Sequence, residues 1–155
     1  MAGADSRTWV LTGSPENYAV THGLGLRLVG LKERRRRQAE QMEQGDRVVY
    51  YLTKRMCFAA SVLITGDLFE DHSAVWPGKP GRPDPYPWRL EAEPELVLEE
   101  AEWLAAETLI DDLEHIRKWP REHWKLAFQG QLRTISTPDS GVLAHRMGQR
   151  AGLRA

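Results

Sequence analysis

The sequence predicts a mixed α+β domain, built on a small curved β-barrel of about five strands flanked by short helices. Strand-like apolar runs and short helix-like segments follow one another in mixed order, which favours a curved sheet over a Rossmann layout. The 155 residues fit one domain, and no internal repeat or inter-domain linker is visible. Hydrophobic residues make up 41% and charged residues 28% of the chain, which excludes disordered, collagen-like and coiled-coil classes.

The first predicted elements are a strand and a capped helix. Residues 8–11 form a short apolar run with β-branched and aromatic members, which favours a strand. Ser14 can cap a helix over residues 15–22, which Gly23 then ends. Pro15 suits the first helical position, because the N–H that proline lacks would be unpaired there.

A charged surface helix and a hairpin should follow. Residues 31–42 favour a helix with a narrow apolar stripe, and Gly45 supplies its end. Residues 47–53 and 58–65 indicate two strands, joined as a hairpin through residues 54–56. In the first of these strands, two faces are expected: Val48, Tyr50 and Leu52 on one, and Val49 and Tyr51 on the other.

The second half begins with a loop. Five of the nine prolines lie within residues 77–87, so this segment is expected to be an extended loop of the kind that carries binding groups. The remaining predicted elements are a strand over residues 89–98 with a bulge or edge at Pro94, an amphipathic helix over residues 105–116, a strand over residues 132–136 and a helix from Thr137.

The chain ends and the cysteine content complete the domain prediction. We expect a disordered N-terminus over residues 1–7, one domain over residues 8–147 and a flexible tail over residues 148–155. The single Cys57 excludes an intramolecular disulfide and is typical of a reducing compartment. We find neither a signal-peptide pattern nor an apolar stretch of about 20 residues. We therefore expect a cytoplasmic monomer with no membrane partner.

Charge is segregated, although the formal net charge is only -1. Residues 27–55 hold nine Lys and Arg against four acids, and residues 91–114 hold ten acids and no Lys or Arg. A basic face can therefore attract phosphates locally. The alternative is a solvated helix held by pairs such as Arg36 with Glu40. The predicted phosphate-binding residues are Lys32, Arg34, Arg35, Arg36 and Arg37, which would give affinity without sequence specificity.

Motifs for nucleotide or metal chemistry are weak. Gly23-Leu24-Gly25 is too short for a dinucleotide fingerprint, and a phosphate loop of the Gly-Lys-Ser/Thr type is absent. Glu70-Asp71-His72 favours a solvated loop, because adjacent residues rarely converge on one ion. Apolar neighbours should keep Cys57 inert. We expect no metal, no cofactor and no catalytic residue.

The six tryptophans divide into two groups. Trp9, Trp103, Trp119 and Trp124 occupy periodic positions and are expected in the core. Trp76 and Trp88, together with Tyr86, flank or lie in the proline-rich loop. These three aromatic rings either anchor the loop or stack on a planar ligand, where base stacking contributes roughly 1–3 kcal/mol per base.

An ordered set of motifs over residues 8–142 resembles the EVE-domain proteins of the PUA-like superfamily, which also contains the YTH and ASCH domains. The motifs are Trp9-Val10-Leu11, Ser14-Pro15-Glu16-Asn17, the arginine-rich segment ending in Met42-Glu43-Gln44-Gly45-Asp46-Arg47-Val48-Val49-Tyr50-Tyr51, the run from Phe69-Glu70-Asp71 to Trp76-Pro77, Tyr86-Pro87-Trp88-Arg89, and Phe128-Gln129-Gly130 leading to Arg133-Thr134-Ile135.

The resemblance implies a pocket beside the first strand and the basic segment. Related domains use such a pocket to receive a modified nucleobase, flipped out of its strand and held by aromatic rings. Asn17 would offer an amide donor and acceptor, and Ser14 a further contact or simply a helix cap. Near residues 25–30, where YTH readers place their first cage tryptophan, this chain has Leu26, Arg27, Leu28 and Val29. The implied nucleobase-binding residues are Ser14, Asn17, Leu28, Val29, Gly30, Tyr51, Trp76 and Trp88.

The predicted function is therefore a non-catalytic module that binds DNA or RNA carrying a modified base, such as a methylated or hydroxymethylated one. One alternative is an ASCH-like amidohydrolase acting on modified nucleosides, for which Lys32, Tyr51 and Glu70 are the candidates. The other is a protein-interaction adaptor that uses the acidic segment over residues 91–114.

Overall fold

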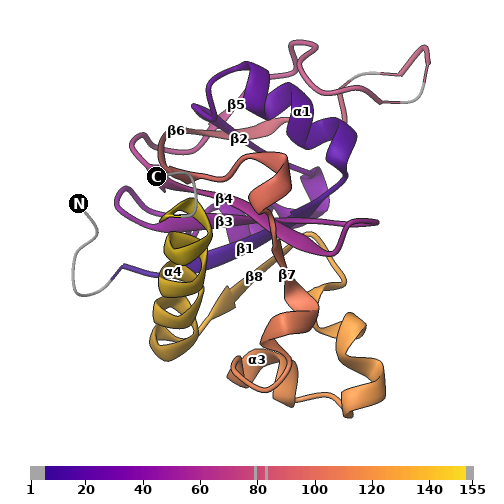
Figure 1. Ribbon diagram of the computed structural model, residues 1–155. Helices are drawn as coiled ribbons and strands as arrows, with labels where there is room; N and C mark the ends of the chain where they lie inside the picture. Colours follow the sequence, from indigo (N-terminus) through magenta and orange to yellow (C-terminus); the bar gives the residue numbers. More distant parts are fainter. Residues whose placement is uncertain (1–5, 79, 83, 153–155) are drawn as a thin grey trace.

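The computed structural model describes residues 6–78, 80–82 and 84–152, which form a curled mixed sheet with short helices around it (Figure 1). The strands are β1 (Thr8–Gly13), β2 (Leu28–Leu31), β3 (Arg47–Leu52), β4 (Cys57–Ile64), β5 (Phe69–Glu70), β6 (Trp88–Val97), β7 (Leu104–Ala105) and β8 (Leu132–Ile135). The main path runs β2-β6-β4-β3-β1-β8, with β5 paired to β6 and β7 to β4. β1 and β3 are parallel, and the other described pairs are antiparallel.

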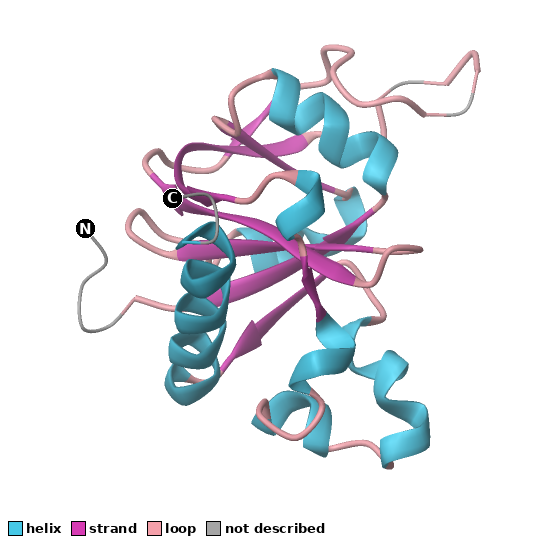
Figure 2. Cartoon of the chain, in the orientation of Figure 1, coloured by secondary structure: helices cyan, strands magenta, loops and turns pink. Residues whose placement is uncertain are grey.

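Helical segments connect and cover the strands (Figure 2). The α-helices are α1 (Pro15–Gly23), α2 (Arg36–Ala39), α3 (Glu114–Arg117) and α4 (Thr137–Gly152), and the 3-10 helices are η1 (Glu33–Arg35), η2 (Glu100–Glu102), η3 (Ala106–Leu109) and η4 (Arg121–Phe128). In the described part of the chain, none of these helices has the length and apolarity that a bilayer crossing requires.

The core consists of two apolar clusters, one on each face of the sheet, and successive residues of β3 alternate between them. Tyr50 belongs to one apolar cluster together with Tyr18 of α1, whereas Val49 belongs to the other together with Leu143 and Met147 of α4. α1 and α4 therefore cover opposite faces. The predicted alternation along β3 is confirmed over its whole length: Val48, Tyr50 and Leu52 join the first cluster, and Val49 and Tyr51 the second.

Several local predictions are confirmed. Ser14 caps α1, since its Oγ accepts the main-chain N–H of Asn17 at 3.1 Å. The β3–β4 hairpin turns through Lys54 and Met56, which have positive φ angles of 66° and 50°. The expected bulge at Pro94 is also present, because the register with β4 changes beside it. The fold class and the five predicted strands are confirmed, and β2, β5 and β7 are additional.

The helix expected over residues 31–42 is wrong. Leu31 is instead the fully buried end of β2, which pairs with β6, and the segment after it contains only the short η1 and α2. Burial of Val29 and Leu31 against the sheet outweighs the helix preference of the charged residues that follow. β2 was not predicted, because the strand is short and Gly30 interrupts its apolar run.

The amphipathic helix expected over residues 105–116 is also wrong. The segment begins in β7, passes through η3 and becomes α-helical only from Glu114. The carboxylate of Asp139, which is 1% exposed, accepts the main-chain N–H groups of Glu114 and His115 and so starts a separate helix there. The side chains at helical spacing are nevertheless buried, at Leu109, Leu113 and Ile116.

Residues near both ends of the described chain contact the rest of the domain. Residues 148–152, assigned above to a flexible tail, form the last part of α4, where Arg150 donates to the carbonyl oxygens of Ala101 and Glu102. At the other end, the main-chain N–H of Arg7 donates to Asp46 at 3.0 Å. Residues 1–5 and 153–155 of the predicted termini lie outside the described residues.

Candidate functional site

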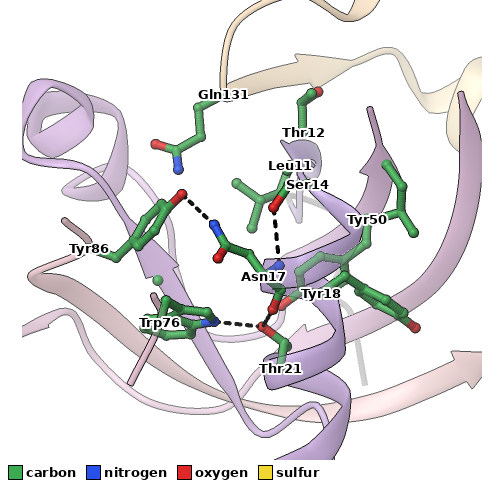
Figure 3. Close-up of a pocket in the computed structure, with 13 residues that line it drawn as sticks. Leu11, Thr12, Ser14, Asn17, Tyr18, Thr21, Tyr50, Trp76, Tyr86 and Gln131 are labelled. Atoms are coloured by element: carbon green, nitrogen blue, oxygen red, sulfur yellow. Dashed lines mark hydrogen bonds between the residues drawn. The ribbon is translucent and has the colours of Figure 1, made fainter. Parts of the chain in front are cut away.

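A pocket opens where the end of β1 meets the first turns of α1. It also receives Gly30 from β2, two side chains from β3 and two aromatic rings from the segment between β5 and β6. Figure 3 shows Asn17 near its centre, with Tyr86 and Trp76 on one side and Tyr18 and Tyr50 on the other. The cavity measures about 40 Å³ and is lined by Leu11, Thr12, Gly13, Ser14, Asn17, Tyr18, Thr21, Gly30, Tyr50, Leu52, Trp76, Tyr86 and Gln131.

Asn17 is the central polar group of the pocket. Its main-chain N–H is held by the cap residue Ser14, which fixes where the side chain leaves α1. The side-chain Nδ2 donates to the hydroxyl of Tyr86 at 2.7 Å. Burial raises the pKa of Tyr86, so its hydroxyl remains protonated at neutral pH and can donate as well as accept. The amide of Asn17 and the hydroxyl of Tyr86 therefore already bind each other in the pocket.

Trp76 forms the wall beside them. Its indole Nε1 donates to the hydroxyl of Thr21 at 2.9 Å, and the side chain is 6% exposed. The ring lies directly over Gly30: a Cβ placed on Gly30 would be 2.4 Å from Cζ3 of the indole. The ring of Tyr86 meets it edge-on, with 5.6 Å between centroids. Only glycine on β2 leaves room for this arrangement.

A buried ion pair positions the segment that carries both rings. Asp84, whose side chain is fully buried, accepts the main-chain N–H groups of Val75, Trp76 and Tyr86 at 2.8 Å each. Arg89 at the start of β6 is 1% exposed and lies 3.5 Å from Asp84. Its guanidinium also donates to Ser73 and to the carbonyl oxygen of Tyr86. The loop is therefore tied to the sheet from inside.

The basic residues predicted to contact phosphates differ in their surroundings. Arg34 and Arg37 are exposed and have no side-chain hydrogen bond or ion pair within the described chain. Arg36 pairs with Glu40 at 3.0 Å and lies 4.6 Å from the ring centroid of Trp88, so the alternative of a paired surface charge applies to it. Lys32 lies beside the pocket, with Nζ 5.8 Å from the ring centroid of Tyr86.

The structure brings four of the predicted base-binding residues together in the pocket: Ser14, Asn17, Gly30 and Trp76. The other four do not line it. Val29 points into the core on the opposite side of β2 from Gly30, and Leu28 also lies outside the lining. Tyr51 lies on the far face of β3, where its ring stacks on Phe128 at 4.7 Å. Trp88 is buried at the start of β6, where its Nε1 donates to Glu33.

The predicted base-binding set omitted several polar residues that line the pocket, among them Thr21, Tyr86 and Gln131. Tyr86 was noted as a loop aromatic, and its place in the proline-rich segment was the signal available. Gln131 carries no signal of its own, since its side chain reaches the pocket rim only because β8 pairs with β1. Its Oε1 accepts the main-chain N–H of Lys32 at 3.1 Å, which joins the rim to the basic segment.

The candidates for catalysis and metal binding are dispersed. Glu70 is exposed and pairs with His72, Tyr51 lies on the far face of the sheet, and Lys32 is at the pocket rim. Within the described residues, no group of three His, Cys, Asp or Glu side chains could hold a metal ion. Burial raises the pKa of the Cys57 thiol, whose Sγ donates to the carbonyl oxygen of Arg55.

The fold resembles that of solved YTH domains. The YTH domain of Zygosaccharomyces rouxii MRB1, in complex with N6-methyladenosine RNA, has a TM-score of 0.67 at 13% identity, covering 95% of this chain and 90% of that one. The Pho92 YTH domain in complex with m6A has a TM-score of 0.69 at 11% identity, covering 95% of this chain and 89% of that one. The Mmi1 YTH domain in complex with RNA has a TM-score of 0.66 at 10% identity, covering 99% of this chain and 84% of that one.

These structures share the PUA-like fold class with this chain, as the motifs predicted. The chain matches no family model and no curated protein sequence. At these identities the likeness establishes the fold, and the EVE assignment remains a prediction from the ordered motifs.

Proposed function

We propose that the protein is a non-catalytic nucleic-acid-binding module that receives one modified nucleobase of a DNA or RNA strand in the pocket of Asn17. The observation that supports this most directly is the pocket itself. A flat wall of indole lies beside an amide and a hydroxyl, and the basic side chain of Lys32 lies at the rim. Stacking on an aromatic ring and edge hydrogen bonds are the two interactions that a flipped base requires.

The pocket must open to admit a base. A cavity of about 40 Å³ has room for a few water molecules, since one water needs roughly 10–15 Å³ on the same measure. Tyr86 occupies the place opposite Asn17 and uses the amide that a base would need. If the edge of a base replaces the Tyr86 hydroxyl, Asn17 keeps the same number of hydrogen bonds. The exchange therefore does not leave the Asn17 amide unpaired.

The exposed cations supply the second part of the proposal. Arg34 and Arg37 are unpaired within the described chain, and Lys32 lies at the rim, so each is available to a phosphate. Contacts of this kind bind every sequence alike and weaken as salt rises. Preference for a modification must therefore come from the pocket, and general affinity from the rim.

The proposal is tested with a panel of single-stranded DNA and RNA oligonucleotides that differ only in one methylated or hydroxymethylated base, at two salt concentrations. We expect salt-dependent binding to all of them and tighter binding to at least one modified strand. N6-methyladenosine RNA is the first probe, because two neighbours of the fold were solved with that modified base. Equal and negligible affinity throughout would contradict the proposal, and release of product from acylated nucleosides would contradict its non-catalytic part.

Replacing Asn17 with alanine should reduce the preference for the modified strand. The variant leaves base-edge groups without their partner, which costs about 1–3 kcal/mol, or roughly 5- to 150-fold in affinity. Alanine favours helix, so α1 should persist. The measurement is titration of modified and plain strands in parallel. Gln44→Ala is the matched control, because this exposed amide contacts Asp67 away from the pocket and its loss should leave both affinities unchanged.

A further inference from the structure

We propose that Arg35 and Arg133 together form a site for one tetrahedral oxyanion, namely a phosphate group of the strand whose base enters the pocket. The inference rests on the proposed function for the source of the phosphate. Arg133 lies in β8, outside the basic segment of the sequence. Of the four consecutive arginines 34–37, Arg35 is the one assigned to this site.

The first observation is that two like charges converge on one point of the backbone. Arg35 comes from η1 and Arg133 from β8, on strands and turns far apart in the sequence. Their Nη2 atoms lie 3.3 Å and 3.4 Å from the place where a Cβ on Gly130 would stand. Burial, and then the charge of Arg35, lower the pKa of Arg133. Such a juxtaposition is unfavourable unless an anion joins it.

The second observation is that neither guanidinium is satisfied by the protein. No carboxylate oxygen of the described residues lies within 4.0 Å of either group. The Nε atoms of Arg35 and Arg133 are both buried without a hydrogen-bond partner in the described chain. A buried donor without an acceptor is unfavourable, because it has lost its hydrogen bonds to water. An oxyanion that accepts from both groups would remove this cost and the repulsion together.

The neighbouring side chains do not supply the hydrogen-bond acceptors that Arg133 and Arg35 lack. Its Nη1 lies 3.3 Å from Nε2 of His115. That same nitrogen is 2.6 Å from the carbonyl oxygen of Ala127, which can only accept. Nε2 must therefore carry the proton and donate to Ala127, and it has no lone pair left for Arg133. Arg35 has one weak partner, Oε1 of Gln38 at 3.3 Å from its Nη1.

The position suits a phosphate next to a flipped nucleotide. Gly130 immediately precedes Gln131, which lines the pocket and accepts the N–H of Lys32. Gly130 has a φ of 88°, a conformation that favours glycine, and its missing side chain leaves the space in which the two guanidinium groups meet. Arg36 contacts Glu40 and Trp88 instead, whereas Arg35 lies beside Gly130.

The test uses the whole chain and two probes. Inorganic phosphate is added while the Nε–Hε resonances of Arg35 and Arg133 are followed by NMR, and plain and modified oligonucleotides are titrated over a range of salt. For Arg133→Gln we expect loss of the phosphate-induced shifts and a salt slope reduced by about 0.7, the value for one contact to a single strand. Affinity should fall by the same factor for plain and modified strands, because a phosphate contact carries no base information.

Two further variants separate charge, geometry and folding. Arg146→Gln removes the same charge from α4, where Arg146 pairs with Asp112, and it should leave the slope unchanged. Arg133→Lys keeps the charge but loses the planar fork, so we expect an intermediate loss with an unchanged melting temperature. Modified-base preference with a normal slope in Arg133→Gln would overturn the phosphate site and leave the proposed function standing. Phosphate-induced shifts without affinity for any strand would instead overturn the proposed function and restrict the site to free phosphate.

Discussion

Asp84→Ala should destabilise the fold by about 3–5 kcal/mol, the cost of removing one partner from a buried ion pair. The carboxylate holds the N–H groups of Val75, Trp76 and Tyr86 and lies against the guanidinium of Arg89. Without it, the three N–H groups lose their acceptor, and the buried charge of Arg89 is left with Asp71 and with its bonds to Ser73 and Tyr86. We also expect the preference for a modified base to disappear, because this segment carries Trp76 and Tyr86 of the pocket. Chemical denaturation measures the first effect and oligonucleotide titration the second.

A matched control for this variant is Asp67→Ala. Asp67 is an exposed aspartate whose carboxylate accepts a hydrogen bond from the side chain of Gln44, so its loss should change stability by no more than about 0.5 kcal/mol. A change of that small size in Asp84→Ala as well would show that the loop is held by other contacts, and the account of the buried ion pair given above would be wrong.

Gly30→Ala should close the pocket and cost about 1–3 kcal/mol of stability, as overpacking of a well-filled site does. The new Cβ would stand 2.4 Å from the indole of Trp76, so the ring must leave its place over β2. The hydrogen bond from Trp76 to Thr21 should break with it. Tryptophan fluorescence and the NMR signal of the Trp76 indole N–H measure the displacement of the ring. Chemical denaturation measures the change in stability.

Gly148→Ala provides the opposite expectation for the same substitution. Nothing lies within 4 Å of a Cβ at Gly148, which is inside α4, so alanine there should stabilise the protein by about 0.4–1 kcal/mol. If Gly30→Ala behaved in the same way and left base preference intact, the close approach of Trp76 to β2 would have no role in binding.

Much of the fold could be predicted because the relevant signals are local. The alternation in β3, the cap at Ser14 and the turn through Lys54 depend on neighbouring residues alone. The two wrong helices depend on distant partners. Leu31 becomes strand because β6 lies beside it, and the helix before Arg117 starts late because Asp139 comes from α4. A single sequence gives no direct sign of either contact.

The site was predicted in part for the same reason. The motif around Asn17 located the polar centre, and the loop tryptophan Trp76 was noticed as an aromatic without an obvious core position. Tyr51 was predicted to bind the base, whereas its neighbour Tyr50 lines the pocket. Adjacent residues of a strand point to opposite faces, and only the pairing partners decide which face holds the pocket. The positions of Gln131 and Arg133 near the pocket could not be predicted, because they depend on the pairing of β8 with β1.

That placement has a consequence for how the molecule matures. β1 lies between β3 and β8, and Thr12 donates its N–H to the carbonyl oxygen of Gln131. A nascent chain that has left the ribosome only through β6 already contains Asn17 and Trp76 but has an open edge along β1. Contacts of such long range form slowly and leave strand edges exposed to aggregation in the meantime. Binding competence should therefore appear in one late step, when the last strand docks beside the first.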